Sequence, residues 1–255
     1  MSDGSLHGSV VAIHDTGRPN WGGWHDTPPN FNFHHSEVRR HISETIAALV
    51  EQGAGHPSFK GVCMHLTRHC FLWFGDEKSG YNDGTVEAFA RAKGLALPDG
   101  LKKDPLRGRA YAAWLRANAW DDWLQWRCDV VTDFYVKEAR TLAARRPDLK
   151  LWLNYMVPAN LSHPDFLKDG FMSSAWRGAG LDPVRLTKEI PNLVLGQTMV
   201  PADYRWRQNY PSPAVRAHQR VLDTLPGFYA NLKGAAFPLV HQHDRYWESP
   251  IGASS

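Results

Sequence analysis

The spacing of apolar residues near the start of the chain predicts a helix followed by a buried strand. Over residues 36–53, apolar positions recur at intervals of three and four, which places them on one face of a helix. These positions are Val38, Ile42, Ile46, Leu49 and Val50. Ser36 is a suitable N-cap residue and Gly53 a suitable terminator. Residues 59–66 then form a short apolar run that is typical of a buried strand.

The same alternation of helical and strand patterns continues to the end of the chain. Further helices are predicted over residues 85–93, 107–145 (one broken helix or two consecutive ones), 182–190 and 213–225. Further strands are predicted over residues 149–157, 193–200 and 235–240, with residues 9–14 as an additional candidate. Helices that alternate with buried strands are typical of a parallel β/α architecture.

The number of predicted strands is small for a chain of 255 residues. A closed eight-stranded barrel takes about 250 residues, yet the segment 67–148 between two predicted strands occupies about a third of this chain. We therefore expect the α/β class and, within it, an incomplete parallel (β/α) barrel of the TIM type whose N-terminal strands are missing. Residues 1–255 would then form a single barrel-like catalytic domain, as a fragment of a larger protein.

Composition and charge narrow the range of partners. The formal net charge of +3 is spread over mixed signs without a basic block, which argues against nucleic acid. No apolar stretch reaches the ~20 residues of a membrane helix, and the N-terminus lacks the pattern of a secretory leader. Three cysteines without a CxxC pair favour a reducing compartment, so we expect a soluble, cytoplasmic protein. Aromatic residues make up 12% of the chain, and their rings suit the apolar faces of sugars.

Acidic residues follow the first and the last of the predicted strands. In parallel β/α folds the functional site forms at the carboxyl ends of the strands. Glycosidic bond cleavage requires a general acid and a second carboxylate. Asp76 and Glu77 follow the first strand, whereas Asp244 and Glu248 follow the last one. We predict these four as the catalytic carboxylates, with Glu77 or Asp76 as acid/base and Glu248 as nucleophile.

Other polar and aromatic residues near the predicted strand ends are candidates for substrate binding. They are His65, Arg68, Trp73, Asn154, Tyr155, His241, His243 and Trp247. Their polar groups would hold hydroxyls and their rings would stack on sugar faces, so an oligosaccharide or polysaccharide is the expected partner. Neither a glycine-rich phosphate loop nor a GxSxG nucleophile elbow occurs, and we predict no cofactor.

Two other functions are compatible with the same residues. His241, His243 and Asp244, together with His65, contain the ligand types of a zinc site, which would make the protein a zinc-dependent hydrolase. A non-catalytic carbohydrate-binding barrel would keep the aromatic rings without the catalytic geometry. Asp83 is a third acidic candidate, although its position just before a predicted helix also suits an N-cap.

The middle of the chain resembles barrel glycoside hydrolases of the beta-galactosidase-like group and their uncharacterised glycosyl-hydrolase-like relatives. The matching segments include HHSEVR at 34–39, HPSFKGV at 56–62, GYNDGTVEAF at 80–89, KGLALP at 93–98, residues 120–128 and RPDLKL at 146–151. Together they lie within residues 34–157, about half of the chain. Most of them are scaffold motifs, so they indicate a fold more than a substrate.

The resemblance implies a sugar-cleaving barrel with an acid after the fourth barrel strand and a nucleophile near the seventh. By that correspondence, residues 59–66 look like the fourth strand and residues 235–240 like a late one. The sequence departs from the group at one important point. The Asn-Glu pair that ends the fourth strand in these enzymes is absent after Leu66, where Thr67-Arg68-His69 stands instead.

Overall fold

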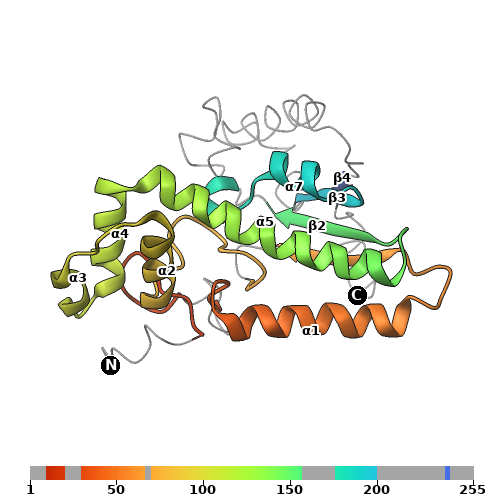
Figure 1. The fold of residues 1–255 in the computed structure, drawn as a ribbon, viewed down its shortest axis with the longest axis horizontal. Coiled ribbons are helices and arrows are strands. Elements are labelled where there is room, and N and C mark those ends of the chain that lie inside the picture. Colours follow the sequence, from red (N-terminus) through yellow and green to blue (C-terminus); the bar gives the residue numbers. More distant parts are fainter. Residues whose placement is uncertain (1–9, 21–29, 67–69, 157–175, 200–238, 242–255) are drawn as a thin grey trace, which may run out of the picture.

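A computed structural model describes residues 10–20, 30–66, 70–156, 176–199 and 239–241, and these contain one parallel sheet packed against helices (Figure 1). The strands are β1 (Gly61–Leu66), β2 (Lys150–Met156), β3 (Leu193–Met199) and β4 (Leu239–His241). Each strand pairs in parallel with the next one along the chain, so the order across the sheet is β1-β2-β3-β4.

The prediction of a TIM-type barrel is wrong. Closure requires eight strands, with the last one paired to the first. The described residues form four strands in an open, sequential order. Between β1 and β2 the chain forms helices. These are α2 (Asp83–Lys93), α3 (Asp99–Lys103), α4 (Arg107–Asn118) and α5 (Trp120–Arg145).

Most of the predicted elements within the described residues are confirmed. The predicted first helix is α1 (Ser36–Gly53), the predicted helix over 182–190 is α7 (Pro183–Glu189), and residues 107–145 form two helices separated at Ala119. The short helix α3 lies between two predicted helices, in a segment for which no helix was predicted. Residues 10–14 form only isolated antiparallel bridges, so the candidate strand there is not part of the sheet. The predicted helix 213–225 lies outside the described residues.

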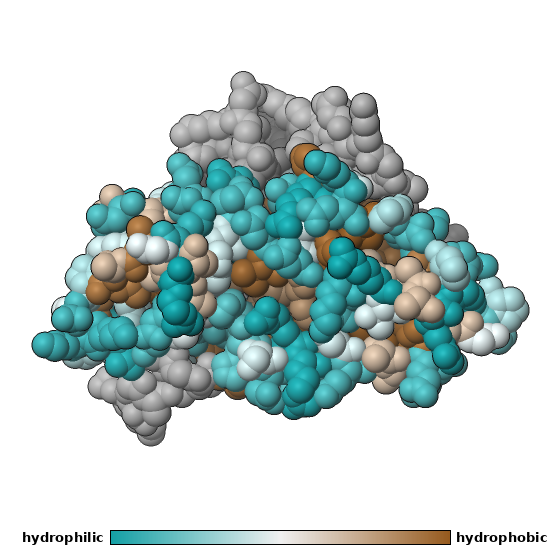
Figure 2. Space-filling view, in the orientation of Figure 1, coloured by the Kyte–Doolittle hydropathy of each residue, from teal (hydrophilic) through white to brown (hydrophobic). Residues whose placement is uncertain are grey.

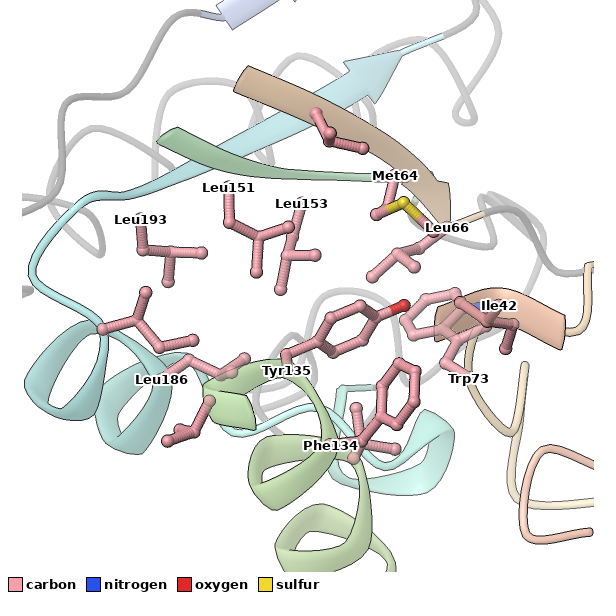
Figure 3. Packing of buried hydrophobic residues seen from close by; sticks show 14 of the residues in the cluster. Ile42, Met64, Leu66, Trp73, Phe134, Tyr135, Leu151, Leu153, Leu186 and Leu193 are labelled. Carbon is pink, nitrogen blue, oxygen red and sulfur yellow. The ribbon is translucent and has the colours of Figure 1, made fainter. Parts of the chain in front are cut away.

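One face of the sheet is covered by helices. Along β1, Val62, Met64 and Leu66 are buried, whereas the alternate residues Cys63 and His65 are exposed. Figure 3 shows the buried side chains of the strands facing α5 and α7. The residues labelled there are Ile42, Met64, Leu66, Trp73, Phe134, Tyr135, Leu151, Leu153, Leu186 and Leu193, all of which belong to one core cluster. The period-two pattern of the strands thus fixes which side chains point away from the helices.

A second apolar cluster joins α2, α4 and the first half of α5. The rings of Trp123 and Trp126 stack at a centroid distance of 5.5 Å, and Phe89 of α2 meets Trp123 edge to face at 5.2 Å. Trp123 and Trp126 therefore serve packing in this part of the molecule. In Figure 1 the cluster forms the end of the molecule toward which the arrow of β2 points.

The face seen in Figure 2 is mostly hydrophilic, with hydrophobic residues visible in separate patches between the helices. Large apolar side chains that are exposed among the described residues include Leu49, Phe71 and Val184. The described helices include none that combines the length and the apolar character needed to cross a membrane.

Candidate functional site

The strand register brings several predicted site residues to the carboxyl edge of the sheet. His65 of β1 lies opposite Asn154 of β2, and Tyr155 is the next residue along that strand. His241 ends β4, where it lies opposite Met199 at the end of β3. His65, Asn154 and Tyr155 thus lie on the neighbouring strands β1 and β2, whereas His241 lies at the same edge on β4, which β3 separates from β2.

His65 and Asn154 belong to a group of four residues on the β1–β2 face that points away from the helices. Cys63 lies opposite Trp152, and one step further along the strands His65 lies opposite Asn154. Cys63 and His65 are exposed, while Trp152 and Asn154 are partly exposed. We call these four residues the edge platform. Trp152 was not predicted as a site residue, although its place two positions before Asn154 on a strand puts both on one face.

The amide of Asn154 is held close to β3. A Cβ atom added at Gly196 would lie 3.1 Å from Asn154 Oδ1, so only the absence of a side chain at this position leaves room for the amide. Asn154 Oδ1 is buried and accepts no hydrogen bond from the described residues. Because buried polar atoms in proteins are nearly always paired, this oxygen has the capacity to accept a bond from water or a ligand hydroxyl.

The predicted acids Asp76 and Glu77 lie in a turn between β1 and α2. The Asp76 carboxylate accepts a hydrogen bond from the backbone N–H of Lys78 at 2.9 Å. The phenol of Tyr81 donates to the carbonyl oxygen of Glu77 at 2.6 Å, and burial raises the pKa of Tyr81 to about 12, so the phenol remains a donor. The Glu77 side chain is exposed, and its Cβ lies 3.3 Å from the position of a Cβ added at Gly178. Glu77 forms no ion pair with a described residue.

The turn is anchored to the N-terminal part of the described chain. The backbone N–H groups of Gly80 and Tyr81 both donate to Ile13 O at 3.0 Å. The side chain of Asn82 accepts from Ile13 N at 3.1 Å and donates to Val11 O at 2.7 Å. The segment GYND therefore serves a structural purpose, because its backbone and amide groups fix the turn that carries the two acids.

Asp83, the third acidic candidate, has a structural role at the start of α2. Its carboxylate lies 3.3 Å from Arg107 Nε of α4. Asn82 occupies the N-cap position, and Asp83 is the acidic residue in the first helical turn, where a negative charge stabilises the helix. These contacts connect α2 to α4 and leave Asp83 away from the edge platform's strands.

Trp73 does not fit the predicted role in sugar binding. It is 1% exposed and packs in the main core cluster with Ile42 and Tyr135. Because stacking on a sugar requires an accessible ring face, its burial excludes this role in the structure. The sequence predicted it from its position after a strand, and only the packing of the loop back onto α1 and α5 shows it to be a core residue.

The remaining predicted site residues are Arg68, His243, Asp244, Trp247 and Glu248, which lie outside the described residues. The pairing of Glu77 with Glu248 therefore stays a prediction. For the zinc alternative, the described ranges contain no group of three or more histidine, cysteine or acidic side chains suited to a metal ion. The histidine-rich segment after β4 lies beyond those ranges.

Comparison with known proteins gives structural similarity of low degree. No protein-family model matches the sequence, and neither does any curated protein. The crystal structure of beta-galactosidase from the psychrophilic Marinomonas ef1 is similar over 77% of this chain, with a TM-score of 0.45 and 15% sequence identity. The present chain spans only 28% of the length of that chain. A similarity of this degree establishes neither a family nor a catalytic residue.

Proposed function

We propose that the protein is a glycoside hydrolase that binds its substrate at the edge platform. The observation that supports this proposal is the placement of Trp152, His65 and Asn154 on one face of the neighbouring strands β1 and β2, with His65 and Asn154 toward the carboxyl edge of the sheet. A sugar ring has apolar C–H faces and a rim of hydroxyl groups, so its recognition needs an aromatic ring beside hydrogen-bonding side chains. The platform supplies both within two neighbouring strands.

The proposed chemistry uses Glu77 as the general acid/base. Its carboxylate is exposed and forms no ion pair with the described part of the chain, while its backbone is fixed through Tyr81. An accessible carboxyl group on a fixed backbone can donate a proton to a leaving group that binds within hydrogen-bonding reach of it. Glu248 is proposed as the second carboxylate on the basis of the sequence alone. An oligosaccharide or polysaccharide is the proposed substrate class.

The first test measures hydrolysis of a panel of nitrophenyl glycosides by the wild type and by Glu77→Gln. Loss of a general acid/base lowers kcat by about 10²- to 10⁴-fold. Glu51→Gln is the matched control, because Glu51 is an exposed glutamate in the last turn of α1. We expect this control to retain the wild-type kcat/KM. An unchanged kcat/KM in Glu77→Gln would contradict the assignment of the acid.

The second test separates substrate binding from catalysis. Trp152→Ala removes the platform ring, and we expect KM to rise about tenfold, which corresponds to the upper end of the energy of an aromatic stacking contact, about 1.4 kcal/mol. Sugar binding by Glu77→Gln should persist, because the platform remains intact. A wild-type protein that binds sugars at the platform without any turnover would be a carbohydrate-binding protein and would refute the hydrolase proposal. A protein with activity that a chelator abolishes would instead support the zinc-dependent alternative.

A further inference from the structure

A fully buried arginine lies directly behind the turn that carries the two predicted acids. Arg127 of α5 is 0% exposed. Its guanidinium carbon lies 4.4 Å from the ring centroid of Phe74 and 5.6 Å from that of Trp123. Its Nη2 donates to the backbone carbonyl of Asp76 at 2.6 Å. Both the ring of Phe74 and the carbonyl of Asp76 belong to the chain segment that leads from β1 into the turn.

The other two nitrogen atoms of the Arg127 guanidinium differ from Nη2 in their surroundings. Nε and Nη1 are buried and have no partner among the described residues. Burial lowers the pKa of Arg127, yet an arginine remains protonated at any physiological pH. The carboxylates whose charge favours the protonated form are those of Asp76 and Glu77. The buried guanidinium cation of Arg127 thus lies on the interior side of the turn that carries Asp76 and Glu77.

The energetics argue against a purely space-filling role for this arginine. A buried charge with unsatisfied donors costs free energy, and an apolar side chain of similar volume would fill the same space at lower cost. What an apolar residue cannot replace is the charge-assisted hydrogen bond to Asp76 O, which is about twice as strong as a neutral one. That bond fixes the peptide that immediately precedes Glu77.

On these grounds, and resting on the function proposed above, we infer that Arg127 is a positioning residue that holds the Asp76–Glu77 turn in the geometry required for catalysis. It acts through the Asp76 carbonyl and through stacking with Phe74, without touching the substrate. Its removal should loosen the turn and lower kcat, while the edge platform on β1 and β2 continues to bind sugar.

Arg146 provides a matched control elsewhere in the fold. Its guanidinium also donates to backbone carbonyls, namely Ala54 O at 2.8 Å, His56 O at 3.2 Å and Phe59 O. These carbonyls lie in the connection from α1 to β1, which is at the amino end of β1. Loss of Arg146 should therefore loosen a connection in the same manner as loss of Arg127, but away from the carboxyl edge.

Limited proteolysis with trypsin measures the loosening without reference to any activity. Lys78 is exposed in the acid-bearing turn, and Lys60 is exposed in the α1–β1 connection. In Arg127→Lys and Arg127→Ala we expect cleavage after Lys78 to accelerate about 10- to 100-fold, the change that corresponds to the loss of one hydrogen bond to a charged donor. In the Arg146 variants the acceleration should occur after Lys60 and not after Lys78. Fragment masses identify each cleavage site.

Turnover and chemical rescue then test the catalytic role. We expect kcat for a nitrophenyl glycoside to fall about 10- to 100-fold in the Arg127 variants, with KM within about twofold of the wild type, because misplacement of a catalytic group affects the chemical step. Guanidinium ion at about 10 mM should restore both turnover and the protection of Lys78 in Arg127→Ala, by filling the vacated site as a planar cation. Urea, which is planar but uncharged, should restore neither.

The possible outcomes are distinguishable. Unchanged cleavage after Lys78 in the Arg127 variants would overturn the inference, as would a loss of kcat of the same size in the Arg146 variants. If Arg127→Ala does not fold, Arg127→Lys keeps the charge and a shorter reach and provides the same two measurements. A wild-type protein without turnover would refute the proposed function and with it the catalytic role of Arg127. Accelerated cleavage would then still establish that Arg127 holds the turn.

Discussion

The partly buried histidine just before α1 predicts a specific dependence of stability on pH. The ring of His34 lies 5.2 Å from the ring of Trp126, centroid to centroid. Burial of the ring, and then the positive charges of Arg39 and Arg91, lower the pKa of His34 from 6.5 to about 4. The folded protein therefore holds a neutral imidazole under conditions in which the unfolded chain already binds a proton.

The direction of the effect follows from proton linkage. Since the folded pKa lies below the unfolded value, protonation favours the unfolded chain, and stability is lost as the pH falls from about 6.5 toward 4. With these two pKa values, the free energy of unfolding should fall by about 2 kcal/mol between about pH 7 and pH 5 through this residue alone. The partial exposure of the ring makes this value an upper estimate.

Two replacements remove the titrating group. His34→Phe keeps a ring beside Trp126, and His34→Gln keeps a polar side chain of similar length. For each variant, the free energy of unfolding minus that of the wild type should be larger at about pH 5 than at about pH 7. Urea unfolding followed by tryptophan fluorescence at several pH values provides the measurement. Wild-type and variant curves that run parallel between these pH values would refute the reasoning.

Three further predictions concern packing and reactivity. Ser43→Ala removes the 2.6 Å hydrogen bond to the buried carboxylate of Glu138 and should lower the free energy of unfolding by about 1–3 kcal/mol in urea unfolding, and a change below about 0.5 kcal/mol would contradict it. Gly180→Ala should destabilise the protein by about 1–3 kcal/mol, because φ is +84° and an added Cβ would lie 2.8 Å from an aromatic carbon, whereas Gly84→Ala in α2 faces open space and should stabilise slightly. A shift of both melting temperatures in the same direction would disagree with this pair. Burial raises the pKa of the Cys128 thiol to about 12, so it should remain unreactive toward a disulfide reagent at about pH 8 until the protein is unfolded, and rapid labelling of the native protein would show otherwise.

The local elements were largely predictable because their signals are local. The bounds of the helix over 36–53 were confirmed, since an amphipathic repeat depends only on neighbouring residues. The predicted N-cap Ser36 was wrong: His35 is the N-cap and its ring accepts from Glu37 N, while Gly53 is the last helical residue and Ala54 the C-cap. The three main strands appear where short apolar runs were found. The helix Asp99–Lys103 was missed because five residues between two prolines carry too little periodicity to indicate a helix.

The candidate site was predictable in its location but only partly in its composition. The carboxyl-edge rule brought His65 and Asn154 together correctly, because parallel strands with a common register end at a common edge. The same rule selected Trp73, which the folding of its loop buries in the core. It also overlooked Arg127, since a residue in the middle of a helix gives no sign in the sequence that its side chain reaches the turn after β1.

The sequence by itself determined the order of helices and strands, the face of each strand that enters the core and the end of the sheet where polar residues gather, because each of these follows from side-chain spacing along a regular backbone. Only the tertiary structure decided that the four strands form an open sheet and that the turn carrying Asp76 and Glu77 is fixed by Ile13, Tyr81 and Arg127. These features depend on contacts between residues far apart in the chain, and such contacts leave no period in the sequence.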